Sequence, residues 1–187
     1  MTQPDNSGFS DLNSPTTVTT TNGGIFLQVA ASGTSNLRGR VKAVPGATPY
    51  TMTAHIRPLT LGVDFADIGL TWYDDTKLAT CHRTYCSSCT PSGNIFTSAK
   101  YTAVTSGATD YAGTTVSANG FGGDFWLRIG NDGANRTCSI SSDGINFITL
   151  HSVGNTDHLT ATKWGFYANS NNATFTAGMT ILSLKIE

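Results

Sequence analysis

The sequence from Asp124 to Leu150, DFWLRIGNDGANRTCSISSDGINFITL, predicts three antiparallel strands joined by two short connections. Phe125, Leu127 and Ile129 occupy every second position of the first run, which is the period of a strand with one buried face. A ribbon of this kind has one apolar face, and that face must be buried against a second layer of structure.

The register of the first two strands follows from the same alternation. Cys138 and Ile140 are the apolar positions of the second run. We expect a four-residue loop, Asp132–Asn135, because a loop one residue longer would turn the apolar positions of one strand against polar positions of the other. This loop sets Ile129 opposite Cys138 and Leu127 opposite Ile140.

The second connection contains Asp143-Gly144. This pair is typical of a two-residue hairpin turn, because glycine adopts a positive φ without a Cβ clash. Such a turn places Ile140 opposite Phe147, and we expect both side chains in the core.

Short strands separated by turn residues are expected along the rest of the chain, with no helical period of any length. The expected strands are Thr16–Thr21, Ile25–Ala30, Tyr50–Arg57, Ile68–Tyr73, Lys77–Tyr85, Asn94–Val104, Lys163–Asn169 and Leu182–Ile186. The residues Gly33–Arg40 are expected to form a loop, and residues 1–12 a polar N-terminal arm. The sequence therefore predicts an all-β chain with one domain, residues 13–187, built as a two-sheet antiparallel sandwich.

The composition excludes some classes of partner. Charged residues make up 12% of the 187 residues and the formal net charge is -1, which gives no electrostatic footprint for nucleic acid. No apolar run approaches the length that spans a bilayer, so we expect no membrane insertion. The first ten residues lack the pattern of a signal peptide, which indicates either cytoplasmic synthesis without that export route or a mature form.

The strand pattern of Asp124–Leu150, followed by Trp164-Gly165-Phe166-Tyr167 and a final alternating strand, resembles the concanavalin A-like (laminin G-like) jelly-roll family. It is most similar to the sandwich modules that are appended to glycoside hydrolases. The resemblance implies a jelly-roll β-sandwich and says little about function.

The four cysteines leave three interpretations open. Cys81, Cys86 and Cys89 lie in the segment CHRTYCSSC, where the spacing of Cys86 and Cys89 is that of zinc ligands and His82 offers a further ligand. A disulfide within this loop is the second interpretation, and free thiols are the third. Cys138 is expected in the core as a small apolar side chain.

Calcium is known near the loops of the resembled fold family, and Asp64 and Asp67 carry oxygens of the kind that calcium prefers. Their spacing is not specific for calcium. We expect no other cofactor.

The acidic residues argue against catalysis. Enzymes on the resembled fold commonly carry glutamates along a strand of one sheet, whereas Glu187, the last residue, is the only glutamate here. Most aspartates lie in predicted turns, where their backbone hydrogen bonds explain them. We expect a protein that is not an enzyme.

A sugar-binding surface is a second functional interpretation. Trp126 and Arg128 fall on the face opposite Phe125 and Leu127, and Tyr73 falls opposite Trp72 in its own strand. Aromatic faces pack against sugar rings, and polar groups bind the hydroxyls. The alternative for Trp126 is packing beneath a loop.

Low charge, a polar arm and the missing glutamates also resemble phage capsid-decoration, head-fibre and tail-attachment proteins. This resemblance implies a virion protein made in the host cytoplasm, with capsid or tail proteins as partners, a homo-oligomeric or lattice-bound state, and a host glycan as ligand. The alternative is a secreted carbohydrate-binding module of a glycoside hydrolase.

Overall fold

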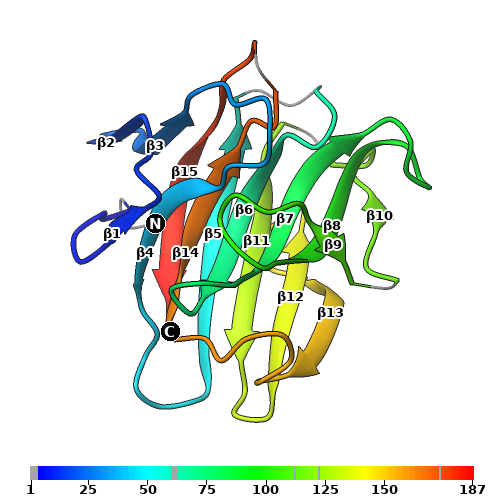
Figure 1. Cartoon of the computed structure of the whole chain (residues 1–187). Coiled ribbons are helices and arrows are strands. Elements are labelled where there is room, and N and C mark those ends of the chain that lie inside the picture. The colour runs from blue at the N-terminus through cyan, green and yellow to red at the C-terminus, as the bar shows by residue number, and fades with distance from the viewer. Residues whose placement is uncertain (1–3, 60–62, 112, 122, 173) are drawn as a thin grey trace.

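The computed structural model describes residues 4–59, 63–111, 113–121, 123–172 and 174–187 (Figure 1). In these residues the regular structure consists of β-strands, with no helix. None of the described residues forms a helix with the length and apolarity needed to cross a membrane.

The strands form two antiparallel sheets that pack face to face. Sheet I has the order β1 (Ser10–Leu12), β4 (Arg38–Ala43), β14 (Lys163–Asn169), β6 (Asp67–Tyr73), β7 (Leu78–Cys86), β8 (Gly93–Tyr101) and β10 (Val116–Ser117), with β9 (Thr109–Asp110) paired to β8. Sheet II has the order β13 (Ile148–Gly154), β12 (Asn135–Ser141), β11 (Phe125–Asn131), β5 (Tyr50–Pro58), β15 (Ala177–Ile186), β3 (Gly24–Val29) and β2 (Thr17–Thr21). The predicted all-β, two-sheet antiparallel sandwich is confirmed.

The main core lies between the sheets and is formed by the alternate positions that face inward. Trp164 is fully buried, stacks on Trp72 with ring centroids 5.6 Å apart and meets Tyr50 edge-on at 5.0 Å. Burying a large apolar side chain contributes roughly 1.5–3 kcal/mol. Trp164 on β14 and Trp72 on β6 thus lie in the main core.

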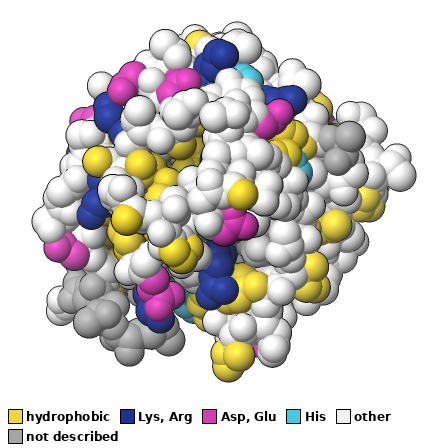
Figure 2. Space-filling view, turned by 90° about the horizontal axis from the view of Figure 1, so that it is seen from below, with side chains coloured by type: hydrophobic (Ala, Val, Ile, Leu, Met, Phe, Trp, Pro, Cys, Tyr) yellow, Lys and Arg dark blue, Asp and Glu magenta, His cyan; other side chains and the backbone are white. Residues whose placement is uncertain are grey.

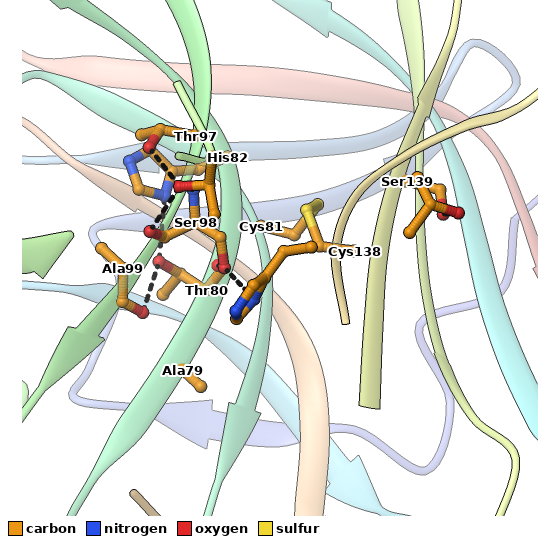
Figure 3. Close-up of a disulfide and its surroundings, with 12 residues drawn as sticks. Ala79, Thr80, Cys81, His82, Thr97, Ser98, Ala99, Cys138 and Ser139 are labelled. Atoms are coloured by element: carbon orange, nitrogen blue, oxygen red, sulfur yellow. Dashed lines mark hydrogen bonds between the residues drawn. A yellow bond between two sulfur atoms is a disulfide. The ribbon is translucent and has the colours of Figure 1, made fainter. Parts of the chain in front are cut away.

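A disulfide crosses this core. Cys81 on β7 and Cys138 on β12 are bonded, and their Cα atoms lie 5.5 Å apart. Figure 3 shows the two cysteines meeting between the sheets, while Thr80 and His82 lie on the other side of β7. The bond therefore ties sheet I to sheet II directly.

The outer face of sheet I is also apolar over part of its area. Its buried side chains are Leu12, Leu37, Val41, Leu78, Ala99, Tyr101 and Tyr167. Residues 102–108, which follow β8, cross this face, and the backbone N–H of Leu37 donates to the carbonyl of Val104 at 2.8 Å. We call residues 102–108 the strap. Sheet I thus has packed side chains on both of its faces.

The predicted register of β11 and β12 is confirmed. Leu127 lies opposite Ile140, and Ile129 lies opposite Cys138. In the loop between them, the Asp132 carboxylate accepts hydrogen bonds from the backbone N–H groups of Ala134 and Asn135. This bonding closes the four-residue loop that the alternation requires.

The predicted turn at Asp143-Gly144 is wrong. Ile140 lies opposite Ile148, because the connection is longer than two residues, and the register shifts further from the turn, between Cys138 and Ser139. Phe147 lies on the outer face, where its ring is 3.6 Å from the Arg128 guanidinium. The sandwich does not depend on this turn, since Ile140 is still 3% exposed and in the core.

The Asp143 side chain explains the longer connection. Its Oδ1 accepts from the backbone N–H groups of Ile145 and Asn146, each at 2.8 Å. These bonds satisfy the turn backbone locally and leave no need for a tight hairpin.

The expected loop Gly33–Arg40 is wrong in its second half, since Arg38–Ala43 forms β4 between β1 and β14. The strand was not predicted because β4 contains charged residues and lacks a clear apolar alternation. Gly39 has a specific role there, because an added Cβ would lie 2.0 Å from the carbonyl oxygen of Phe166.

The expected arm, residues 1–12, lies partly against the sandwich. Phe9 is 7% exposed and packs on Phe166 with ring centroids 5.3 Å apart, and Ser10–Leu12 pair with β4 as β1. Residues 1–3 lie outside the described part of the chain. From Phe9 onward the segment is an integral part of sheet I.

Candidate functional site

A hollow of about 320 Å³ opens on the outer face of sheet I, next to the strap. Strands β6, β7, β8 and β14 supply its floor, and loops supply its rim. The lining residues are Ser35, Phe65, Asp67, His82, Thr84, Cys86, Cys89, Ile95, Thr97, Tyr101, Gly107, Ala108, Asp110, Asn169 and Asn171. No lysine or arginine is among these described residues, so the hollow has no cationic group to bind an anion.

Asp67, the first residue of β6, is the central polar group of the floor. Its Oδ2 accepts hydrogen bonds from the hydroxyls of Tyr101 at 2.9 Å and Tyr167 at 3.0 Å. Its Oδ1 is buried and has no hydrogen-bond partner among the described residues. A buried carboxyl oxygen without a partner is costly, and a bound donor would satisfy it.

The burial of Asp67 changes its protonation. Burial raises the pKa of this carboxyl from 3.8 to about 7, although the bonds from Tyr101 and Tyr167 and the nearby Asn169 amide favour the charged form. Both tyrosines have pKa values raised well above 10, first by burial and then by the charge of Asp67. They stay neutral and remain donors to Asp67.

His82 on β7 is the second buried titratable group of the floor. Its Nδ1 lies 2.9 Å from the hydroxyl of Thr80. Burial lowers the pKa of the imidazole to about 3, so the ring is neutral at physiological pH. It therefore adds a neutral polar edge to the floor.

The backbone of β6 allows this arrangement. Gly69 lies opposite Tyr167 on one side and opposite His82 on the other. A Cβ at Gly69 would meet the carbonyl oxygen of Cys81 at 2.3 Å. The missing side chain lets the strands approach closely where two functional side chains flank the glycine.

The rim is held by a second disulfide, Cys86–Cys89, with Cα atoms 5.5 Å apart. Asp64 fixes the same loop, because its carboxylate accepts from the backbone N–H and the hydroxyl of Ser87 at 2.6 and 2.8 Å. Phe65 is 50% exposed at this rim. It offers an apolar surface beside a polar floor.

These disulfides bear on the cysteine interpretations. No cysteine of the chain is free, and Cys81, Cys86 and Cys89 have no thiolate to offer a metal in this form. His82 is bonded to Thr80 in the floor of the hollow. The disulfide interpretation describes the cysteines in this structure, and the zinc interpretation stays a prediction.

The calcium expectation has no support from the geometry. Asp64 is bound to Ser87, whereas Asp67 is bound to two tyrosines. Within the described residues, no group of three or more His, Cys, Asp or Glu is arranged to hold a metal ion.

The three predicted sugar-binding residues are not brought together. Tyr73 is in sheet I, where the ammonium of Lys163 lies 5.9 Å from its ring, while Trp126 and Arg128 are in sheet II. Tyr73 therefore lies apart from Trp126 and Arg128, which share the outer face of β11. Alternation within one strand assigns a face, but it does not assign a strand to a sheet.

Trp126 and Arg128 are neighbours whose partners are already in the fold. His55 stacks on Trp126 with ring centroids 3.8 Å apart, and a Cβ at Gly144 would lie 2.8 Å from the indole. Arg128 donates to the Thr53 hydroxyl at 2.8 Å and lies over the Phe147 ring. The alternative of packing beneath a loop describes Trp126 better than an open platform does.

On the face that Figure 2 shows, charge does not mark a further site. Figure 2 shows one face of the molecule, on which acidic and basic side chains are scattered among uncharged ones. The net charge of -1 agrees with this mixture. A second cavity of about 20 Å³ is lined by Arg136, whose buried Nε and Nη1 atoms also have no partner in the described residues. We take the hollow over Asp67 as the candidate site because its volume, about 320 Å³, can hold a ligand.

Sequence comparison gives no family, since no protein-family model and no curated protein matches the chain. Solved structures do resemble it. A functionally unknown protein from Saccharomyces cerevisiae is 16% identical with a TM-score of 0.71, and the match covers 97% of this chain and 96% of that one.

Two further likenesses concern proteins that act on or bind sugars. The GH43 protein BlXynB from Bacillus licheniformis, as the K247S mutant, is 12% identical with a TM-score of 0.67, and the match covers all of this chain and 40% of that one. The exoplasmic/lumenal domain of VIP36, bound to Ca²⁺ and Man3GlcNAc, is 11% identical with a TM-score of 0.65 and matches over 96% of this chain and 83% of that one. At these identities the likeness shows the fold alone, a concanavalin A-like two-sheet β-sandwich.

Proposed function

We propose that this chain is a carbohydrate-binding protein without catalytic activity, and that the hollow over Asp67 binds a neutral sugar unit. The observation that carries the proposal is the buried, unpartnered Oδ1 of Asp67 on the floor of a 320 Å³ cavity. A sugar hydroxyl supplies the missing donor. The volume lies at the small end of the range of about 300–1,000 Å³ for ligand sites, which suits one or two sugar rings.

The chemistry of the lining supports a neutral polyol. Hydroxyl and amide groups from Thr84, Thr97 and Asn169 surround Asp67, and Phe65 provides an apolar rim. Sugars present hydroxyls at their edges and apolar C–H faces, which fits such a mixture. The GH43 and VIP36 likenesses support the same ligand class by analogy of fold.

The absence of an enzyme activity is part of the proposal. Asp67 has two tyrosine partners, whereas glycoside hydrolysis needs an acid and a second carboxyl group placed on opposite sides of the bond. Asp110 is the other carboxyl that lines the hollow, and it is an exposed residue. Release of reducing sugar that is lost in Asp67→Asn would contradict a pure binding role.

The test is calorimetric titration with methyl β-D-xylopyranoside, xylotriose and a mannose disaccharide, at pH 8. We expect at least one probe to bind the wild type, and Asp67→Asn to bind it at least tenfold more weakly. Trp126→Ala is the matched control on sheet II, and we expect it to keep the wild-type affinity. Loss of binding in Trp126→Ala with retention in Asp67→Asn would move the site to the other sheet.

The disulfides bear on the compartment. Two disulfides and no free cysteine are typical of proteins that fold in an oxidising environment. These disulfides support the proposal that the protein folds outside the reducing cytosol, which is the secreted alternative.

The virion role stays a prediction. Neither the fold nor the likenesses bear on capsid or tail partners, a lattice-bound state or a host glycan receptor. Co-purification of the chain with virus particles would support that role, and glycan binding in the hollow is compatible with it.

A further inference from the structure

Phe65 departs from two local rules at the rim of the hollow. Its φ is +59°, a left-handed conformation that bulky side chains rarely adopt. Among the described residues it is the one apolar side chain with such a φ, the others being asparagine, serine, aspartate and histidine. The residue is also 50% exposed and belongs to neither core cluster of the described structure. Neither the backbone conformation nor burial therefore favours a phenylalanine here.

The neighbouring residues hold Phe65 in this conformation. Asp64 accepts hydrogen bonds from the backbone N–H and the hydroxyl of Ser87, and the backbone N–H of Phe65 donates to the carbonyl of Tyr85 at 2.8 Å. On the other side, Ala66 is buried at 3% exposure. The backbone is thus fixed on both sides of Phe65. A strained conformation that its surroundings enforce is typical of a functional site.

Phe65 lines the hollow together with polar side chains, among them Thr84, Thr97 and Asn169. A pyranose ring has hydroxyls at its edge and C–H groups on its face, and such a face packs on an aromatic ring. An open-chain polyol has the hydroxyls but no such face. An exposed aromatic ring at this rim therefore distinguishes the two kinds of ligand.

Resting on the proposed function, we infer that Phe65 is the stacking platform of the hollow, and that its ligand is a pyranoside with an apolar C–H face and not an open-chain polyol. Asp64 is the positioning residue of this platform. It is not among the described residues that line the hollow, and it acts by fixing the backbone of Phe65 through Ser87.

The experiment titrates the full chain with the probe sugar that binds best and with the open-chain alditol of the same sugar, xylitol or mannitol. We expect the wild type to bind the sugar about tenfold more tightly than the alditol, because only the sugar gains the aromatic contact and its buried apolar area. The ring current of Phe65 is expected to shift sugar C–H protons upfield in NMR spectra. In Phe65→Ala, both this shift and the preference are expected to be lost.

Two further variants separate the ring from its backbone. Phe65→Gly lacks the ring as Phe65→Ala does, so we expect equally weak binding. It is expected to unfold at a higher urea concentration than Phe65→Ala, because glycine adopts a positive φ without strain. Asp64→Ala is expected to reduce the preference for sugar over alditol in the wild type, and to have no further effect on it in Phe65→Ala.

The outcomes separate this inference from the proposed function. An unchanged preference in Phe65→Ala, or a Phe65→Gly variant that is no more stable than Phe65→Ala, overturns the inference. The proposed function stands in that case if the sugar still binds and Asp67→Asn weakens its binding. Failure of every probe sugar to bind the wild type overturns the proposed function, and the inference falls with it.

Discussion

Asp67 and His82 are both buried in the floor of the hollow, and they have opposite effects on how stability depends on pH. The folded chain holds a proton on Asp67 that the unfolded chain releases between pH 3.8 and about 7, so this contribution is present at low pH and is lost as pH rises through 7. His82 does the reverse, because only the unfolded chain protonates it between about pH 3 and 6.5. Its contribution is present above pH 6.5 and is lost as pH falls.

The two contributions oppose each other between pH 3.8 and 6.5, with slopes of up to about 1.4 kcal/mol per pH unit each. We expect the free energy of unfolding of Asp67→Asn to rise with pH relative to the wild type, and that of His82→Asn to fall. Urea denaturation at pH 4.5, 5.5 and 6.5 measures both slopes. Identical slopes in the three proteins would contradict the assigned protonation states.

Trp126 is a structural residue in this fold. Its indole is sandwiched between the His55 ring and the turn at Gly144. We expect Trp126→Ala to lower the free energy of unfolding by about 2 kcal/mol, less than for a fully buried tryptophan, because the side chain is half-buried. Chemical denaturation measures this, and an unchanged stability would restore the open platform.

At the scale of elements, the two disulfides differ in what they join. Cys81–Cys138 closes 57 residues and links the sheets, whereas Cys86–Cys89 spans three. Chain entropy predicts losses of about 4 kcal/mol for Cys81→Ala with Cys138→Ala, and about 2 kcal/mol for Cys86→Ala with Cys89→Ala. Thermal unfolding of the two double variants measures the order. Equal losses would show that loop length does not govern them.

The connection from β12 to β13 is built around one carboxylate. Asp143→Ala removes the bonds to the backbone N–H groups of Ile145 and Asn146. We expect a loss of about 1 kcal/mol and higher hydrogen exchange in residues 142–147, because the turn backbone loses its acceptors. Asp132→Ala at the β11–β12 loop is the comparison, and protection that is unchanged at 142–147 would contradict this role.

The strands that can be predicted from this sequence are those in which apolar and polar residues alternate. β5 and β6 carry an apolar side chain at every second position, and these side chains form the core. β4 was not predicted, because its pairing with β14 depends on backbone hydrogen bonds and on Gly39 and not on an apolar pattern. The turn at Asp143 was misjudged because a side-chain acceptor competed with the two-residue hairpin.

For the whole molecule, the sandwich followed from the period-two pattern, but the site did not. Asp67, Tyr101 and Tyr167 are distant in sequence and meet only because β6 separates β14 from β7 in sheet I. Alternation places Asp67 and Tyr167 on the outer faces of their strands. Alternation does not give the order of the strands in the sheet, because long-range packing determines that order.

The strap gives sheet I a second covered face, with the Leu37–Val104 bond holding it down. Packing on both faces favours a sheet that opens rarely, so we expect a ligand bound over Asp67 to meet a floor already in its final shape. Any conformational change on binding would then occur at the rim, in Phe65 and in the loop closed by the Cys86–Cys89 disulfide. Substitutions in these rim residues would change which ligand binds without changing the sheet below.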